Sequence, residues 1–325
     1  MQKISRLLGG LFSLVILTGL AWVLLNSQLV LDQLRVWQFQ PSDEIVALAT
    51  NSGMSARGRF QFYATRPKLE SSAEFNNKCR RAEAASPILG CYKQGEDTIH
   101  IYDVTDKKLD GVKEVTAAHE MLHAVWERLS ATEKARLGGL LDIAYDKVKD
   151  DQLAKRMAYY DRTQPGSRHN ELHSILGTEY ADLGDELEKH YAKYFTYRTK
   201  VVSLHKKYNQ VFEALESQSE QLNNKLSAQK TVIQQRKSAY DSAIVNLNSR
   251  IADFNQRAQQ GDFNSQQQFY QERFTLQAEG QRLKTEREAI IALIEAYNQD
   301  VEKLNSLGKQ AERLNQSLDS HRAVE

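Results

Sequence analysis

The stretch that decides the fold is Ala117-Ala118-His119-Glu120-Met121-Leu122-His123-Ala124-Val125-Trp126, which contains H-E-x-x-H. Its pattern predicts a helix. Two histidines four residues apart lie on one helical face, so both imidazoles can bind one metal ion. Zinc accepts imidazole nitrogens in a tetrahedral shell. Glu120 is placed to take a proton from the water that zinc activates, so the motif predicts zinc-dependent hydrolysis of peptide bonds.

A pair of packing or surface histidines is the alternative interpretation, because a five-letter motif with two free positions also arises by chance. The residues around the motif are apolar, which predicts that this helix is largely buried. Three buried polar side chains would be costly without strong partners. A metal ion supplies such partners, so the zinc interpretation is favoured.

A catalytic zinc ion requires a third protein ligand and an open position for water. The segment from His169 to Tyr180 follows a loop and resumes a helical pattern. His169 and His173 share one face of that helix, whereas Glu171 points nearly the opposite way, so only one of these faces can meet the metal. On this argument three residues stay open as the third ligand: Glu171, Glu179 and His173.

These two predicted helices resemble those of the glutamate zincins, or gluzincins, whose third ligand is a glutamate on a separate helix some tens of residues after H-E-x-x-H. The stretch Glu171-Leu172-His173-Ser174 followed by Glu179-Tyr180 is similar to the glutamate helix of clan members related to lethal factor and the Mlc titration factor. The resemblance covers only these two helices, and Ile175 stands where other gluzincins have an aspartate. It implies a zinc ion bound by His119, His123 and Glu171, with Glu120 as general base.

A side chain that stabilises the oxyanion is also expected in such a site. Tyrosine and histidine are the residue types suited to this role. The sequence does not choose among five eligible side chains: Tyr159, Tyr160, His169, His173 and Tyr180.

The N-terminus carries two cations, Lys3 and Arg6, before an uncharged run from Leu7 to Leu31. A run of this length can span a bilayer as a helix, and the cations favour an N-terminus in the cytoplasm. A cleaved signal peptide is the alternative, with Gly19-Leu20-Ala21 as a cleavage site. Because the apolar run continues beyond that site, an uncleaved anchor is favoured. Under either interpretation, the rest of the chain lies outside the cytoplasm.

The charge bears on the partners of the chain, and its cysteine content agrees with this compartment. Lys and Arg number 43 and Asp and Glu number 42, so nothing in the charge indicates nucleic acid as a partner. Cys79 and Cys91 are an even pair at short spacing, which predicts a disulfide in an oxidising compartment. Two free thiols are the weaker alternative.

Three segments before the motif read as strands, at residues 58–64, 88–93 and 98–104. Gly95-Glu96-Asp97 supplies turn chemistry between the last two, which predicts a hairpin in a small sheet. The segment 98–104 is the expected edge strand, where an extended substrate can be added as another strand. Ser42 and Ser130 are expected to cap the helices that follow them.

From about Glu186 onward, glutamine, asparagine, lysine and glutamate become frequent. Sustained seven-residue spacing predicts a coiled coil. A break at Gly261-Asp262-Phe263-Asn264, followed by an S-x-x-Q capping box from Ser265, predicts an antiparallel hairpin. A parallel dimer through each arm stays open as an alternative. The residues that repeat every seven positions are Leu276, Leu283, Ile290, Tyr297, Leu304, Ala311 and Leu318.

These patterns predict an α+β chain: a transmembrane anchor at 1–31, a small zincin-like metallopeptidase domain at 32–190 with a short sheet and active-site helices, and a coiled-coil hairpin at 191–325. The expected function is a membrane-anchored, extracytoplasmic zinc metallopeptidase acting on a peptide or protein substrate. The hairpin would serve as a spacer, a docking arm for a protein partner or a self-association element. The alternative function is a cell-envelope scaffold with a structural zinc site, but such a site has no need of Glu120.

Overall fold

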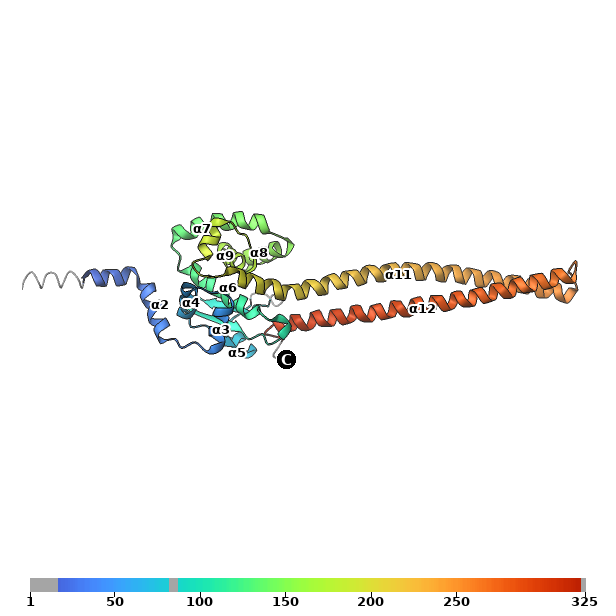
Figure 1. Ribbon diagram of the computed structural model, residues 1–325, viewed down its shortest axis with the longest axis horizontal. Helices are drawn as coiled ribbons and strands as arrows, with labels where there is room; N and C mark the ends of the chain where they lie inside the picture. Colours follow the sequence, from blue (N-terminus) through green and yellow to red (C-terminus); the bar gives the residue numbers. More distant parts are fainter. Residues whose placement is uncertain (1–16, 82–86, 323–325) are drawn as a thin grey trace, which may run out of the picture. The chain divides into compact units, whose positions relative to one another are not determined.

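The computed structural model describes residues 17–81 and 87–322 (Figure 1). The chain divides into two compact units, Met1–Val211 together with Arg313–Glu325, and Phe212–Glu312. The first unit combines a three-stranded sheet with packed helices, so the α+β class is correct at this coarse level. This unit extends past the predicted boundary at residue 190 and includes the C-terminal residues.

The sheet consists of β1 (Lys68–Glu70), β2 (Gly90–Lys93) and β3 (Thr98–Tyr102) in the order β1-β3-β2. β1 pairs parallel with β3, and β2 pairs antiparallel with β3. The predicted hairpin is therefore confirmed. The prediction that 98–104 is an edge strand is wrong, because β3 is paired on both sides and buried along its whole length. β2 is an edge of this sheet.

The predicted strand at 58–64 is also wrong, because Ala56–Ala64 forms helix α4. The Ser55 hydroxyl accepts a hydrogen bond from the backbone N–H of Gly58 at 3.1 Å, which caps the helix. Gly58 and Phe62, four residues apart, are both buried, as the helical period requires. The alternating aromatic residues of this segment imitate a strand pattern. The third strand is instead β1, which is only three residues long.

The motif helix α6 (Val112–Glu127) runs through the core, and most of its residues are buried. In Figure 1, α7, α8 and α9 lie on one side of α6, while α3, α4 and α5 lie on the other. Gly177 of α9 permits close approach to α6, because a Cβ there would lie 2.5 Å from Leu122 Cδ1. The predicted caps at Ser42 and Ser130 are confirmed, the latter as a capping box with Glu133.

The remaining elements of the first unit are short. They connect the sheet to α6 and complete the layers around it. Their bounds are α2 Ser27–Gln38, α3 Asp43–Asn51, α5 Ser72–Lys78, η1 Lys107–Leu109, α7 Ala131–Val148, α8 Asp151–Thr163, α9 Arg168–Glu179 and α10 Asp185–Tyr191.

A buried ionic cluster joins α2 to the β2–β3 hairpin and to the end of α6. Arg128 donates through Nε and Nη2 to the two oxygens of Asp32, each at 2.8 Å, and Nη2 also lies 2.9 Å from Asp97 Oδ2. The Tyr92 hydroxyl donates to Asp97 Oδ1 at 2.6 Å. Asp32 and Asp97 are buried, so their negative charges would destabilise the fold without the positive charge of the arginine beside them.

Arg128→Ala is expected to lower the free energy of unfolding by about 3 kcal/mol, because it removes the arginine that pairs bidentately with the buried Asp32 and also contacts Asp97. Arg35, which also pairs with both carboxylates, then has to compensate their charge alone. Urea denaturation followed by circular dichroism measures this change. Arg136→Ala is the matched control, since the ion pair of Arg136 with Glu186 is exposed and should be worth little. Equal stability of the two variants would contradict the importance of the cluster.

Most of the predicted anchor lies outside the described residues, since these begin at residue 17. Residues 17–25 are helical and are followed by α2. Within the part of the chain that the structure describes, no helix combines the length and apolar character needed to cross a membrane.

The second unit is built from two long helices, α11 (Arg198–Gln260) and α12 (Gln266–Leu318), which pair antiparallel within it. Ion pairs join Lys225 to Asp300 at 2.7 Å, Arg236 to Glu286 at 2.8 Å, and Arg257 to Glu272 at 2.5 Å. As the residue numbers of the α11 partners rise, those of their α12 partners fall, so the two helices run antiparallel. This is the kind of hairpin that the sequence predicted. The Ser265 hydroxyl accepts from the backbone N–H of Gln268 at 3.2 Å and so caps α12.

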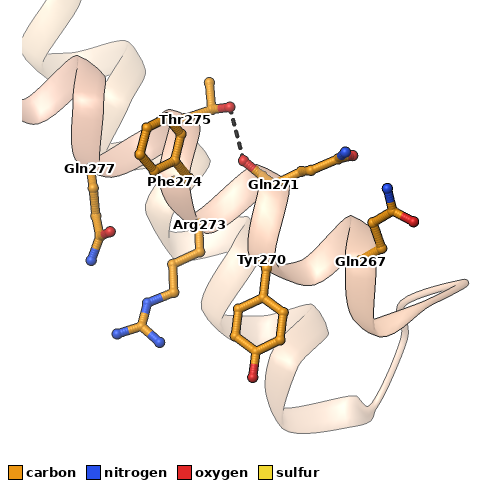
Figure 2. Close-up of a pocket in the computed structure, with 7 residues that line it drawn as sticks. All are labelled: Gln267, Tyr270, Gln271, Arg273, Phe274, Thr275 and Gln277. Carbon is orange, nitrogen blue, oxygen red and sulfur yellow. Dashed lines mark hydrogen bonds between the residues drawn. The ribbon is translucent and has the colours of Figure 1, made fainter.

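A hollow on α12 near the hairpin turn is lined by seven residues from Gln267 to Gln277 (Figure 2). Tyr270 and Phe274, one turn apart, are 55% and 72% exposed. The Thr275 hydroxyl donates to the carbonyl oxygen of Gln271 at 2.9 Å. The seven lining residues include no histidine, cysteine or carboxylate, so this hollow offers no metal site and no acid–base pair.

Candidate metal centre

Three side chains from α6 and α9 converge at one point. His119 Nε2 and His123 Nε2 lie 3.1 Å apart, and Glu171 Oε2 lies 4.0 Å from the first and 3.8 Å from the second. One donor atom from each residue falls within 4.8 Å of the others. Ligand atoms around tetrahedral zinc are about 3.3 Å apart, given bond lengths of about 2.0 Å. The spacing therefore suits a single zinc ion.

The donor chemistry also fits a zinc ion. Glu171 Oε2 is buried and has no hydrogen-bond partner among the described residues, a costly state for a carboxylate oxygen unless it binds a cation. His123 Nδ1 lies 2.9 Å from Asn170 Oδ1. In the tautomer that donates from Nδ1 to Asn170, the Nε2 lone pair of His123 faces the other two donors. Two neutral imidazoles and a carboxylate form a zinc-binding set.

The electrostatic environment differs between the two imidazoles. Burial lowers the pKa of His119 well below its ordinary value, and the nearby charge of His123 lowers it further. His119 is therefore neutral, which is the form that binds metal. Burial also acts to lower the pKa of His123, but the carboxylates of Glu171 and Glu120 outweigh it and raise that pKa. The same carboxylates would attract a metal cation.

Glu120 lies between the two histidines in the sequence and is buried at the same cleft. Burial raises its pKa to about 7, and the charge of Glu171 raises it as well. The charge of His123 and a backbone hydrogen bond from Tyr92 act in the opposite direction. A carboxyl group that titrates near neutrality can both accept a proton and return it.

The edge strand β2 lies directly against Glu120. A Cβ atom at Gly90 would lie 2.7 Å from Glu120 Oε1 and 2.7 Å from Thr116 Cγ2. The backbone of β2 at Gly90 therefore lies close to the Glu120 carboxylate. This close approach and the backbone hydrogen bond from Tyr92 together fix the position of that carboxylate. Sequence reasoning did not identify Gly90 as a site residue. The available signal was a glycine inside a strand pattern, which often marks close approach of the backbone to another group.

The three converging side chains open into a cleft of about 990 Å³. Helix α8, strand β2 and the segment before β2 all contribute side chains to its walls. The disulfide Cys79–Cys91 is present, as predicted, and Cys91 itself lines the cleft. This bond ties the segment after α5 to the edge strand.

The structure brings Glu171 to the two histidines and directs the other candidate ligands elsewhere. His173 Nε2 lies 2.9 Å from His190 Nε2, in a buried position away from the cleft. Glu179 accepts two hydrogen bonds from Arg156, each at 2.7 Å. Because α9 continues through Gly177 to Glu179, no new helix begins that could turn Glu179 toward the metal.

Two of the five candidates for oxyanion stabilisation line the cleft, namely Tyr159 and Tyr160. Burial raises the pKa of Tyr160, and Glu171 raises it further, so this hydroxyl keeps its proton. His169 instead pairs with Asp142 at 3.0 Å. Neither His173 nor Tyr180 lines the cleft.

Comparison of the chain with protein-family models, with curated proteins and with solved structures finds no match. Function is therefore inferred from the site itself, since fold alone does not determine function. That site joins a zinc-type donor set, an adjacent buried carboxyl group and a cleft large enough for a peptide.

Proposed function

We propose that this chain is a zinc-dependent peptidase with His119, His123 and Glu171 as zinc ligands and Glu120 as general base. The observation that carries the proposal is the convergence of these three donors, with Glu171 Oε2 buried and unpartnered among the described residues. A zinc ion held there would supply Lewis-acid chemistry, polarising a peptide carbonyl and acidifying a water molecule.

Glu120 performs the proton transfers of the proposed reaction. Its carboxylate accepts the proton of the attacking water and then returns it to the amine that leaves when the peptide bond breaks. Tyr160 is assigned to donate a hydrogen bond to the oxyanion that forms from the carbonyl oxygen. This assignment is supported by its place in the cleft wall and by the influence of both Glu171 and Glu120 on its pKa.

Strand β2 is the proposed binding edge for the substrate backbone. Gly90, Cys91 and Tyr92 all line the cleft, and β2 pairs with β3 on one side only. An extended peptide can add to such an edge through main-chain hydrogen bonds, which gives affinity without demanding one sequence. The substrate is therefore proposed to bind at β2, and not at the segment 98–104 that the sequence analysis expected to be the edge strand.

The competing scaffold function requires a structural zinc site, which is normally closed by four protein ligands. Among the described residues, the cluster has three donors and borders a cleft. Glu120 adds an acid–base group that a structural site does not need. These features favour catalysis over a purely structural role for the metal.

The proposal includes anchoring by residues 1–31, with the catalytic unit and the hairpin outside the cytoplasm. The Cys79–Cys91 disulfide supports this compartment, because such bonds persist mainly in oxidising environments. The hairpin of α11 and α12 is assigned a spacer or docking role, since its central pairs are structural ion pairs and apolar contacts.

Hydrolysis of unstructured peptides tests this function. Full-length, zinc-loaded protein is incubated with a random peptide mixture in water labelled with a heavy oxygen isotope. Hydrolysis is expected to produce new carboxyl termini that carry this isotope. Mass spectrometry detects both the new termini and the label. Zinc-free protein serves as the control. Tight zinc binding without any new termini would favour the scaffold function instead.

Gly90→Ala is expected to lower kcat/KM by about 100-fold, because the added Cβ would displace Glu120 or β2 and small displacements of catalytic groups are costly. Zinc content should stay at one ion per chain, since the three ligands are untouched. Gly95→Ala in the same hairpin is the matched control, because nothing lies within 4 Å of its Cβ position. Full activity of Gly90→Ala would contradict the positioning of Glu120 by β2.

A further inference from the structure

The charged side chains that line the cleft are unevenly distributed. Apart from Glu120 and Glu171 at the metal centre, Glu127 is the one carboxylate among the described lining residues. It is already engaged, since Gln94 Nε2 donates to it at 2.7 Å and Lys134 Nζ lies 3.7 Å away. The cations that line the same cleft are Arg80, Arg81, Lys155, Arg156 and Arg162.

Two of these cations have structural partners outside the cleft lining. Arg81 pairs with Asp319 at 3.0 Å, and Arg156 pairs with Glu179 at 2.7 Å. Their charges are therefore largely neutralised by carboxylates that hold the walls together. They do not by themselves attract an anionic substrate.

Lys155 and Arg80 differ from those two residues. Both are exposed, and within residues 17–81 and 87–322 neither forms an ion pair with a carboxylate. They come from separate elements, since Lys155 belongs to α8 and Arg80 follows α5 next to Cys79. Among the residues that the structure describes, two walls of the cleft therefore carry a cation without a paired carboxylate.

Helix α8 arranges its contribution along one face. Lys155, Tyr159 and Arg162 are spaced four and three residues apart, so they follow one another along the helix on the cleft side. The Arg162 guanidinium lies 5.7 Å from the centre of the Tyr159 ring, which holds the aromatic side chain between the two cations. Such a face suits a substrate with alternating carboxylate and apolar side chains.

We propose that the cleft selects acidic peptides, with Asp or Glu side chains near the scissile bond contacting Lys155 and Arg80. A cleft lined by one sign of charge concentrates ligands of the opposite sign and improves productive encounter. An extended peptide on β2 places alternate side chains on one face about 7 Å apart, so acidic side chains on either side of the bond can reach both walls. This inference rests on the proposed peptidase function.

A library experiment with zinc-loaded, full-length protein tests the preference. A randomised peptide mixture is digested, and the cleaved bonds are identified by mass spectrometry. Asp and Glu are expected to be enriched near the cut. The best-cleaved sequence is then synthesised in two forms, with Glu or with Gln at the enriched positions. The Glu form should show roughly tenfold higher kcat/KM, because two exposed charge pairs each change the rate a few-fold.

Charge-reversal variants identify the residues responsible. Lys155→Glu and Arg80→Glu should each reduce the Glu-to-Gln ratio of kcat/KM several-fold, and the double variant should bring it below one. Lys206→Glu is the matched control, because Lys206 is an exposed lysine that does not line the cleft. Raising the ionic strength from about 0.05 M to about 0.5 M should also reduce the ratio, since salt screens exposed charges.

The outcomes separate this inference from the function on which it rests. Equal kcat/KM for the Glu and Gln forms, with both peptides cleaved, would overturn the acidic preference and leave the peptidase function standing. A ratio unchanged by Lys155→Glu and Arg80→Glu would overturn the assignment of these two residues. Failure to cleave any peptide of the library would overturn both proposals.

Discussion

Glu120→Gln is expected to lower kcat by about 10³-fold while one zinc ion per chain is retained. Glutamine has nearly the same shape as glutamate but cannot accept the proton of the attacking water, and loss of a general base typically costs 10²–10⁴-fold. The three ligands stay in place, because Glu120 is not one of them. Peptide cleavage kinetics and zinc content by plasma mass spectrometry measure the two effects on the same sample.

Glu114→Gln is the matched control for this result. Glu114 lies on the same helix, α6, and does not line the cleft. Its substitution should leave both kcat and zinc content near the values of the unmodified chain. Full activity of Glu120→Gln would contradict the role of this residue as general base, whatever the zinc content.

Glu171→Ala is expected to weaken zinc binding by more than the roughly 10–100-fold that loss of an outer-shell partner costs. The reason is geometric, since Glu171 Oε2 lies about as far from the two histidine nitrogens as a third zinc ligand would. His123→Ala should cause a loss of similar size. Zinc affinity is measured by competition with a chromophoric chelator, and circular dichroism verifies that each variant is folded.

Two substitutions on the same helix serve as controls for the ligand assignment. Glu179→Ala and His173→Ala are expected to keep one zinc ion per folded chain, because these side chains contact Arg156 and His190 instead. If Glu171→Ala retains its zinc while either control loses it, the third ligand has been assigned to the wrong residue.

The helical period alone limited the choice of third ligand to one face of residues 169–180. Glu171 and His173, two positions apart, cannot both face one point, and the structure agrees with that constraint. Which face meets α6 depends on how two helices separated by about forty residues pack together. No local pattern encodes that packing, so the resemblance to gluzincins supplied the choice of Glu171 in the sequence analysis.

The sheet shows where local patterns fail. Strand β1 has only three residues and acquires its role through pairing with β3, about thirty residues away. The edge position of β2 follows from this pairing and could not be inferred from β2 itself. Conversely, the alternating aromatics of residues 58–64 imitate a strand, although the Ser55 cap and the burial of Phe62 stabilise a helix.

The contacts around the candidate site were also missed, because they join distant parts of the chain. Arg128 and Asp32 are 96 residues apart, yet they form a buried bidentate pair. Gly90 contacts Glu120 only because β2 crosses the motif helix at that point. Residue types suggested the candidate zinc ligands, whereas the arrangement around them required the three-dimensional structure.

The assignment as a zinc-dependent peptidase is tested most directly by titrating the metal-free, full-length chain with zinc. Bound zinc and the rate of peptide cleavage are measured on the same samples. The rate of cleavage is expected to rise in proportion to bound zinc and to reach its maximum at one ion per chain. Glu120→Gln should bind the same amount of zinc with almost no rise in rate. A chain that binds no zinc, or one that binds a full equivalent and cleaves no faster than Glu120→Gln, would contradict the assignment as a zinc peptidase.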